Sequence, residues 1–331
     1  MDSATHVVMG IGLAGLATID PVVAHSTAET HAVLVGTLAG SIIPDVDTVL
    51  KFKNNATYIR NHRGITHSIP ATLLWPILLA AVIMIIFPTA NMFHLWLWTF
   101  IGVFLHVFVD IFNAYGTQAI RPLSYRWVAL GMINIFDPFI FGIHIVGFIL
   151  WYFVGYPWMI FSAVYAILII YYLWRAYVHR KIVNRVKARL PDAIEVFLSP
   201  TLRWSQYHLS VKAENNYYVG EITAASVNII DTFTRKPVPD NDIIQAAKKD
   251  KNLHAFLSFS PIHRWEVSPF EKGYEVKFID LRYLSKGHYP FVAAVWLDDH
   301  LNIISSYTGW VYSEKKLRKK LLPSTRRERR A

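Results

Sequence analysis

The stretch from His62 to Ser68 contains two histidines, an arginine and two hydroxyl side chains, directly before a long apolar run. The histidines are five residues apart, too far for neighbouring positions on one helix face, so we expect a turn that Gly64 makes possible. Imidazole is a common ligand for transition metals, and a guanidinium group matches the geometry of phosphate. We therefore predict that His67 binds a metal ion, while His62 and Arg63 act on a substrate.

Two further pairs of ionisable residues lie near the ends of apolar segments. His106 and Asp110 have the i, i+4 spacing that places an imidazole and a carboxylate on one helix face. Ionisable groups inside a membrane segment are costly and tend to face a functional interior, which favours metal ligation over a simple His–Asp hydrogen bond between helices. Asp45 and Asp47 follow Pro44, where the preceding apolar segment ends or kinks. They would either bind a metal ion or lie in a solvated loop. The predicted metal ligands are His6, Asp45, Asp47, His67, His106 and Asp110.

A site built from histidine and aspartate suits Zn²⁺ first, with Mn²⁺ or Fe²⁺ as alternatives. The chain has no cysteine, which excludes thiolate metal sites, disulfides and cysteine nucleophiles. One or two bound ions would support hydrolysis, because a metal ion lowers the pKa of its bound water and polarises an ester or phosphoryl oxygen. Arg63 would clamp an anionic substrate group or, equally, pair with lipid phosphate. His62 would be a ligand, an acid/base or a residue that orients a ligand, and His6 would otherwise be a capping histidine.

Membrane helices must position these residues, because hydrophobic residues make up 53% of the chain and concentrate before about residue 175. A transmembrane helix needs ~20 mainly apolar residues. The clear candidates are 69–88, 93–112, 138–154 and 157–174. Two runs rich in Gly and Ala, 6–19 and 31–43, predict a helical hairpin that either spans the membrane or lies shallow in it. We therefore predict an α-helical integral membrane domain with four clear spans, or six if the hairpin also crosses.

Lys and Arg gather in one set of loops and are absent from the alternate set. The first set comprises 50–63, 113–137 and the region after 174, and the second comprises 20–30, 88–92 and 155–157. Positively charged loops stay in the cytoplasm, so the even number of crossings places both termini there. All the predicted metal ligands then lie at the cytoplasmic face of a multi-pass protein of the cell membrane.

From about residue 195 the pattern changes to short β-rich runs that alternate with turn residues. This predicts a soluble α+β domain at 195–312, joined to a membrane domain at 1–175 by a basic helical linker at 176–194 and followed by a basic tail at 313–331. The net charge of +10 comes largely from the linker and the tail. Basic residues beside a membrane most often face anionic lipid, so we expect membrane lipid as a partner and disfavour nucleic acid. The C-terminal domain is available to a protein partner.

Four motifs occur in the order THVVMG, PDVD, HRGITHS and HVFVD. In this order they resemble the membrane-bound metal-dependent hydrolase family, also described as LexA-binding, inner-membrane-associated hydrolases, over about residues 1–175. More distantly, the pattern is similar to the all-helical zinc-dependent phospholipase C and single-strand nuclease group, which implies phosphoester hydrolysis. The ligands that this likeness implies are Asp45 or Asp47, His67, His106 and Asp110, with His6 as the early histidine. The chain lacks that group's histidine shortly after Asp110 and its late glutamate, which argues against a full three-metal centre.

Two functions from different classes fit these patterns. The first is a membrane-bound metal-dependent hydrolase that acts at the cytoplasmic face on a phosphoester or lipid-like substrate, such as a phospholipid-like molecule. The second is a membrane-tethered regulatory or binding protein with a structural metal site. Structural metal sites are closed, so an open coordination position would favour the enzyme.

Overall fold

The computed structural model describes residues 1–331 except 225, 271–272, 286 and 323–331. The chain forms two compact units and passes from one to the other several times. The first unit comprises Met1–Asp47, His62–Asn184 and Ser199–Trp204, and the second comprises Thr48–Asn61, Arg185–Leu198 and the chain from Ser205 onward.

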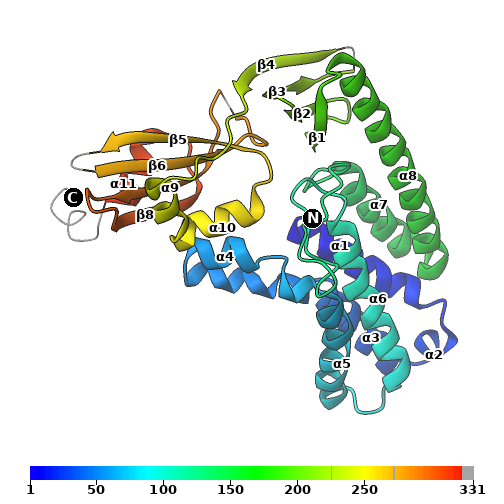
Figure 1. The fold of residues 1–331 in the computed structure, drawn as a ribbon. Helices are drawn as coiled ribbons and strands as arrows, with labels where there is room; N and C mark the ends of the chain where they lie inside the picture. The colour runs from blue at the N-terminus through cyan, green and yellow to red at the C-terminus, as the bar shows by residue number, and fades with distance from the viewer. Residues whose placement is uncertain (225, 271–272, 286, 323–331) are drawn as a thin grey trace. The chain divides into compact units, whose positions relative to one another are not determined.

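The first unit is a bundle of apolar helices (Figure 1). Its longer helices are α1 (Ser3–Ala17), α3 (Thr27–Gly40), α5 (Ile69–Ile86), α6 (Met92–Asp110), α7 (Pro138–Val154) and α8 (Pro157–Arg189). Its short elements are α2 (Pro21–Ala24) and the 3-10 helices η1 (Ile43–Phe52) and η2 (Ile65–His67). Both η1 and α8 end in the second unit. The predicted fourth run and most of the predicted linker are one continuous helix, α8, of 33 residues.

Polar caps define where the apolar helices begin. The side chains of Ser68, Asn91 and Asp137 accept hydrogen bonds from backbone N–H groups in the first turns of α5, α6 and α7. Such caps satisfy donors that the first helical turn leaves without a partner. The helices therefore start within one residue of the predicted apolar runs.

Among the residues that the structure describes, three helices are long and apolar enough to cross a membrane, namely α5, α6 and α8. The pair α3 and η1, bent by 46°, makes a fourth if the two form one broken span. The remaining apolar helices α1 and α7 are shorter. The helical bundle is as predicted, while the number of membrane crossings remains a prediction.

Glycine residues allow α3 and α6 to pack closely. A Cβ atom on Gly40 would lie 2.8 Å from the carbonyl oxygen of Thr99, and one on Gly102 would lie 3.0 Å from that of Thr37. Small residues at such contacts are typical of membrane helix bundles, because they let backbones approach. The close approach places the end of α3 beside the last turns of α6.

The second unit contains two four-stranded antiparallel sheets, where the sequence predicted an α+β domain. The first sheet orders its strands as β1 (Ala193–Pro200), β2 (Tyr207–Ala213), β3 (Asn216–Ile222) and β4 (Val227–Thr234). The second contains β5 (His263–Phe270), β6 (Gly273–Asp280), β7 (Phe291–Leu297) and β8 (Ile303–Trp310). Its helices are α4 (Asn55–Asn61), α9 (Asp242–Lys248), α10 (Lys251–Phe259) and α11 (Glu314–Leu321).

Helices α10 and α11 bury apolar side chains against the second sheet. Every residue of β7 is buried, and α10 packs on β7 and β8. Leu317 and Leu321 of α11 join a core cluster with Val292 and Trp296. Helix α11 lies in the segment predicted as a basic tail, and residues 323–331 of that prediction lie outside the described residues.

Helix α4 belongs to the second unit although it lies between two motifs of the first. It packs against α10 and β8, and the Asn55 side chain donates a hydrogen bond to the carbonyl oxygen of Thr308 (3.2 Å). The chain thus leaves the first unit after Asp47 and returns to it at His62.

Candidate metal centre

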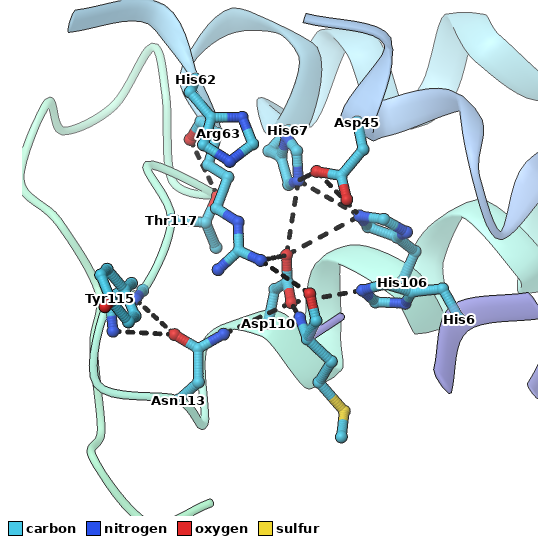
Figure 2. Close-up of polar contacts among 12 residues, drawn as sticks. His6, Asp45, His62, Arg63, His67, His106, Asp110, Asn113, Tyr115 and Thr117 are labelled. Atoms are coloured by element: carbon cyan, nitrogen blue, oxygen red, sulfur yellow. Dashed lines mark hydrogen bonds and ion pairs between the residues drawn. The ribbon is translucent and has the colours of Figure 1, made fainter. Parts of the chain in front are cut away.

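Four of the predicted ligands converge in the first unit from three elements (Figure 2). They are Asp45 of η1, His67 of η2, and His106 and Asp110 of α6, and their ligand atoms all lie within 4.8 Å of one another. Nε2 of His67 is 3.6 Å from Asp45 Oδ1 and 3.6 Å from Asp110 Oδ2. A tetrahedral ion with ligands ~2.1 Å away keeps its ligand atoms ~3.4 Å apart, so the side chains are close to this spacing.

The backbone around η2 turns sharply to bring His67 inward. Arg63 has a positive φ of 57°, and Gly64 has a ψ of −97°, outside the regions that other residues prefer. The sequence assigned the unusual backbone to Gly64 alone, and the structure shares it between the two residues. His67 itself is fully buried.

The hydrogen-bond partners of His106 determine which of its nitrogens is free. Its Nδ1 lies 2.6 Å from the carbonyl oxygen of Ser41, at the end of α3. A carbonyl oxygen can only accept, so Nδ1 carries the hydrogen and Nε2 has a lone pair.

The hydroxyl group of Thr66 determines which nitrogen of His67 carries the hydrogen. Thr66 Oγ1 lies 2.7 Å from Asp47 Oδ2, to which it donates its hydrogen, and 3.0 Å from His67 Nδ1. With its hydrogen used, the hydroxyl accepts from His67 Nδ1, and His67 Nε2 has a lone pair. Burial, together with nearby His106 and Arg63, holds the pKa of His67 well below its usual value, which keeps the ring neutral.

Two imidazole lone pairs therefore face each other, with Nε2 atoms 3.3 Å apart. Carboxylate oxygens of Asp45 and Asp110 lie 3.8 Å and 3.7 Å from His106 Nε2. All four atoms are acceptors, so they do not hydrogen-bond one another. Four such atoms within 4.8 Å of one another could hold a metal ion, and two imidazoles with two carboxylates suit Zn²⁺, Mn²⁺ or Fe²⁺.

Asp110 also contacts Arg63, through the same oxygen that faces the two histidines, and the amino group of Met1. Its Oδ2 lies 3.2 Å from Arg63 Nη2, and its Oδ1 forms an ion pair with the amino group of Met1. His6 Nε2 lies 3.4 Å from the same Oδ1, and the His6 ring stacks on His106 with centroids 3.7 Å apart. His6 therefore lies beside the four-ligand group and faces the opposite oxygen of Asp110 (Figure 2).

Asp47 makes its contacts with the stretch from His62 to Thr66. Its Oδ1 lies 2.7 Å from His62 Nδ1, and its Oδ2 accepts from the backbone N–H of Arg63 (2.8 Å) as well as from Thr66. Asp45, Asp47 and His62 also form a second group whose ligand atoms lie within 4.8 Å of one another. Asp47 thus organises the turn, and it lies where it could contribute to a second ion.

Three residues after α6 support the site and were not singled out in the sequence. Asn113 Nδ2 approaches Asp110 Oδ1 at 3.4 Å, while Thr117 Oγ1 and the backbone N–H of Gln118 donate to the carbonyl oxygen of Arg63 at 3.0 Å and 2.9 Å. The residues after the helix gave no clear signal in the sequence, because these polar residues are interspersed with apolar ones such as Ile111 and Phe112. The roles of Thr117 and Gln118 follow from contacts with Arg63, more than fifty residues earlier in the chain.

Comparison with known proteins gives matches over nearly the whole chain. The family model described as YdjM inner membrane protein matches residues 1–182. The models described as YfhP middle domain and YfhP C-terminal alpha/beta plait domain match residues 191–233 and 242–321. The first range covers all but the last residue of the first sheet, and the second contains the second sheet. The chain is 56% identical over 322 residues to the uncharacterized protein YfhP of Bacillus subtilis (strain 168), covering 97% of this chain and 98% of that protein. No solved structure matches the chain.

Proposed function

Because this chain belongs to the YdjM inner membrane protein family, we propose that it is a membrane-bound metal-dependent hydrolase that cleaves a phosphoester or lipid-like substrate at the cytoplasmic face of the cell membrane. One observation carries the proposal. Four acceptor atoms, from Asp45, His67, His106 and Asp110, converge at one point in the helical unit.

The hydrogen bonds around the site favour a cation over a network of internal hydrogen bonds. Ser41 and Thr66 each take the Nδ1 hydrogen of one histidine, so both Nε2 atoms point inward as lone pairs. A bound Zn²⁺, or Mn²⁺ or Fe²⁺, would supply an activated water and polarise the oxygen of the scissile bond.

Of the four side chains, that of Asp45 is the only one partly exposed, although its oxygen Oδ1, which faces the two histidines, is buried. The side chain of Asp45 is 16% exposed, whereas those of His67, His106 and Asp110 are fully buried. A substrate would therefore approach along Asp45, and an open coordination position there is what distinguishes a catalytic from a structural site.

Arg63 and His62 supply the remaining chemistry. The Arg63 guanidinium lies 3.2 Å from Asp110, beside the ligands, where it would bind an anionic group of the substrate or transition state. His62 directs Nδ1 to Asp47 and its side chain is partly exposed, so its Nε2 is placed to move a proton to or from the leaving group.

Metal analysis of the detergent-purified protein tests the proposal. We expect His106→Ala to lose most of its bound metal, since it removes one of four ligands, and to lose hydrolysis of bis-p-nitrophenyl phosphate or p-nitrophenyl acetate. His144→Ala is the matched control, because His144 is equally buried in α7 but donates to its own helix at the Ile140 carbonyl. It should keep the wild-type metal content.

Full metal content in His106→Ala would contradict the shared site. Wild-type protein that binds a metal but hydrolyses neither probe would favour the membrane-tethered regulatory protein. That alternative has one supporting observation, since the second unit holds the segment Thr48–Asn61 between Asp47 and His62.

A further inference from the structure

The loop that follows α6 is hydrogen-bonded to the backbone on either side of the turn that holds His67. Thr117 and Gln118 both donate hydrogen bonds to the carbonyl oxygen of Arg63. A few residues later, the backbone N–H of Ile69 donates to the carbonyl oxygen of Arg121 (3.1 Å). The loop is therefore held in place by the same residues that shape the site.

These contacts also determine how deep the loop lies relative to the membrane. Ile69 is the first residue of α5 and Asp110 is the last residue of α6, and both helices are long and apolar enough to cross a membrane. A loop bonded to Ile69 lies where those two helices leave the hydrocarbon layer, at the level of the lipid headgroups.

The outer face of the loop is apolar, unlike that of an ordinary polar connection. Leu123 is 82% exposed and Tyr125 is 66% exposed, and Ile120 is exposed as well. Ile65, in the adjoining turn η2, is 64% exposed. Contiguous exposed apolar side chains of this kind mark a surface that meets a partner or a membrane.

The charges on the loop favour lipid as that partner. The Arg121 guanidinium lies over the Tyr125 ring, 4.7 Å from its centroid, and Arg126 is exposed. Tyrosine with arginine at the end of a membrane helix is the composition of a bilayer interface, where the ring sits among headgroups and the cation meets phosphate. The apolar face also continues onto α5, whose Ile69 and Leu73 are exposed on the exterior of the bundle.

We propose that residues 117–126 form a membrane-docking loop, in which Ile120, Leu123 and Tyr125 insert into the headgroup layer of the leaflet beside the metal centre and Arg121 and Arg126 bind anionic phospholipid headgroups. The proposal does not depend on hydrolysis. If the proposed function holds, the loop places the substrate entrance of the site at the lipid surface.

The absence of cysteine from the chain allows a clean test by site-specific labelling. The full chain carrying Leu123→Cys is labelled with bimane and reconstituted in nanodiscs of phosphatidylcholine with phosphatidylglycerol. His300→Cys is the control, since the His300 side chain is 82% exposed in the turn between β7 and β8. Both variants are first required to elute as monodisperse protein.

We expect a lipid with a nitroxide near its headgroup to quench the Leu123 label several-fold more than the His300 label, and aqueous iodide to show the reverse order. Adding Arg126→Gln should reduce lipid quenching at position 123 in discs with phosphatidylglycerol, but not in phosphatidylcholine alone. Equal iodide quenching at both positions would overturn the proposal. Shielding of Leu123 in cell membranes but not in nanodiscs would also overturn it, in favour of a protein partner. Neither result depends on metal content or turnover, so the proposed function is tested separately.

Discussion

The hydroxyl group of Thr66 links Asp47 to His67 with a defined direction of hydrogen bonding. Asp47 can only accept, so the single hydroxyl hydrogen points to it and the oxygen accepts from His67 Nδ1. Outer contacts of this kind fix the tautomer and ring orientation of a ligating histidine. The geometry of the proposed metal site therefore depends on Thr66, a residue that is not itself a proposed ligand.

Replacement of Thr66 tests this dependence. We expect Thr66→Val to weaken metal binding by about 10–100-fold, because the buried His67 Nδ1–H loses its acceptor, and to lower the free energy of unfolding by about 1–3 kcal/mol. Thr66→Ser keeps the hydroxyl and should stay near wild type. Competition with a chelator of known affinity measures the metal affinity of both variants. An unchanged metal affinity in Thr66→Val would remove Thr66 from the site.

At the scale of elements, the packing of α3 against α6 determines the position of His106. Gly40 lies one residue before Ser41, whose carbonyl oxygen receives the hydrogen of His106 Nδ1. A side chain at position 40 would have to push Thr99 of α6 away. The tight helix contact is thus a requirement of the site as well as of the bundle.

Two glycine substitutions separate this effect from helix propensity. We expect Gly40→Ala to destabilise the protein by about 1–3 kcal/mol through overpacking and to reduce its metal content. In Gly142→Ala the new methyl group meets nothing within 4 Å, so stability should be unchanged or slightly increased, since alanine favours helix. Thermal unfolding in detergent and metal analysis compare the two variants. Equal stability and equal metal content would show that the α3–α6 contact does not limit either.

The distribution of Lys and Arg predicts the orientation of the helices in the membrane. We expect Lys53→Cys, which follows η1, to react with a membrane-impermeant maleimide only from the cytoplasmic side, and Thr89→Cys, between α5 and α6, only from the outside. Labelling of intact cells and of inverted vesicles distinguishes the two faces. The opposite pattern would reverse the topology and move the metal centre to the outer face.

At the scale of the whole molecule, the boundaries of the second unit differ from simple sequence ranges. Helix α11 buries Leu317 and Leu321 in the core of the second sheet, and α4 contributes from residues that precede the metal-centre motif. The second unit is therefore completed by segments on both sides of the β-rich region.

Fragments of the second unit should show the contribution of α11. We expect residues 190–322 to unfold cooperatively in solution, and residues 190–312 to be much less stable, because each buried leucine contributes about 1.5–3 kcal/mol. The free energy of unfolding of a small domain is only about 5–15 kcal/mol, so the shorter fragment should be close to unfolding. Urea titration followed by circular dichroism measures the difference, and identical midpoints would show that α11 is dispensable.

Local features of the sequence determined the helices and indicated the candidate site residues. Apolar runs and caps such as Ser68 and Asn91 depend on neighbours in the chain, so α5, α6 and α7 lie close to the predicted ranges. The i, i+4 spacing of His106 and Asp110 likewise follows from helix geometry alone.

Only the tertiary structure decided how those residues are arranged. The position of His6 across Asp110 from the other ligands, the hydrogen bonds from Asp47 to the turn, and the membership of α4 in the second unit all depend on contacts between distant parts of the chain. Residues such as Thr66 and Thr117 carry no local signal, because a hydroxyl group gains its role from the partner that folding brings to it. Helix periodicity is a property of short segments, whereas the direction of each hydrogen bond at the site is a property of the packed bundle.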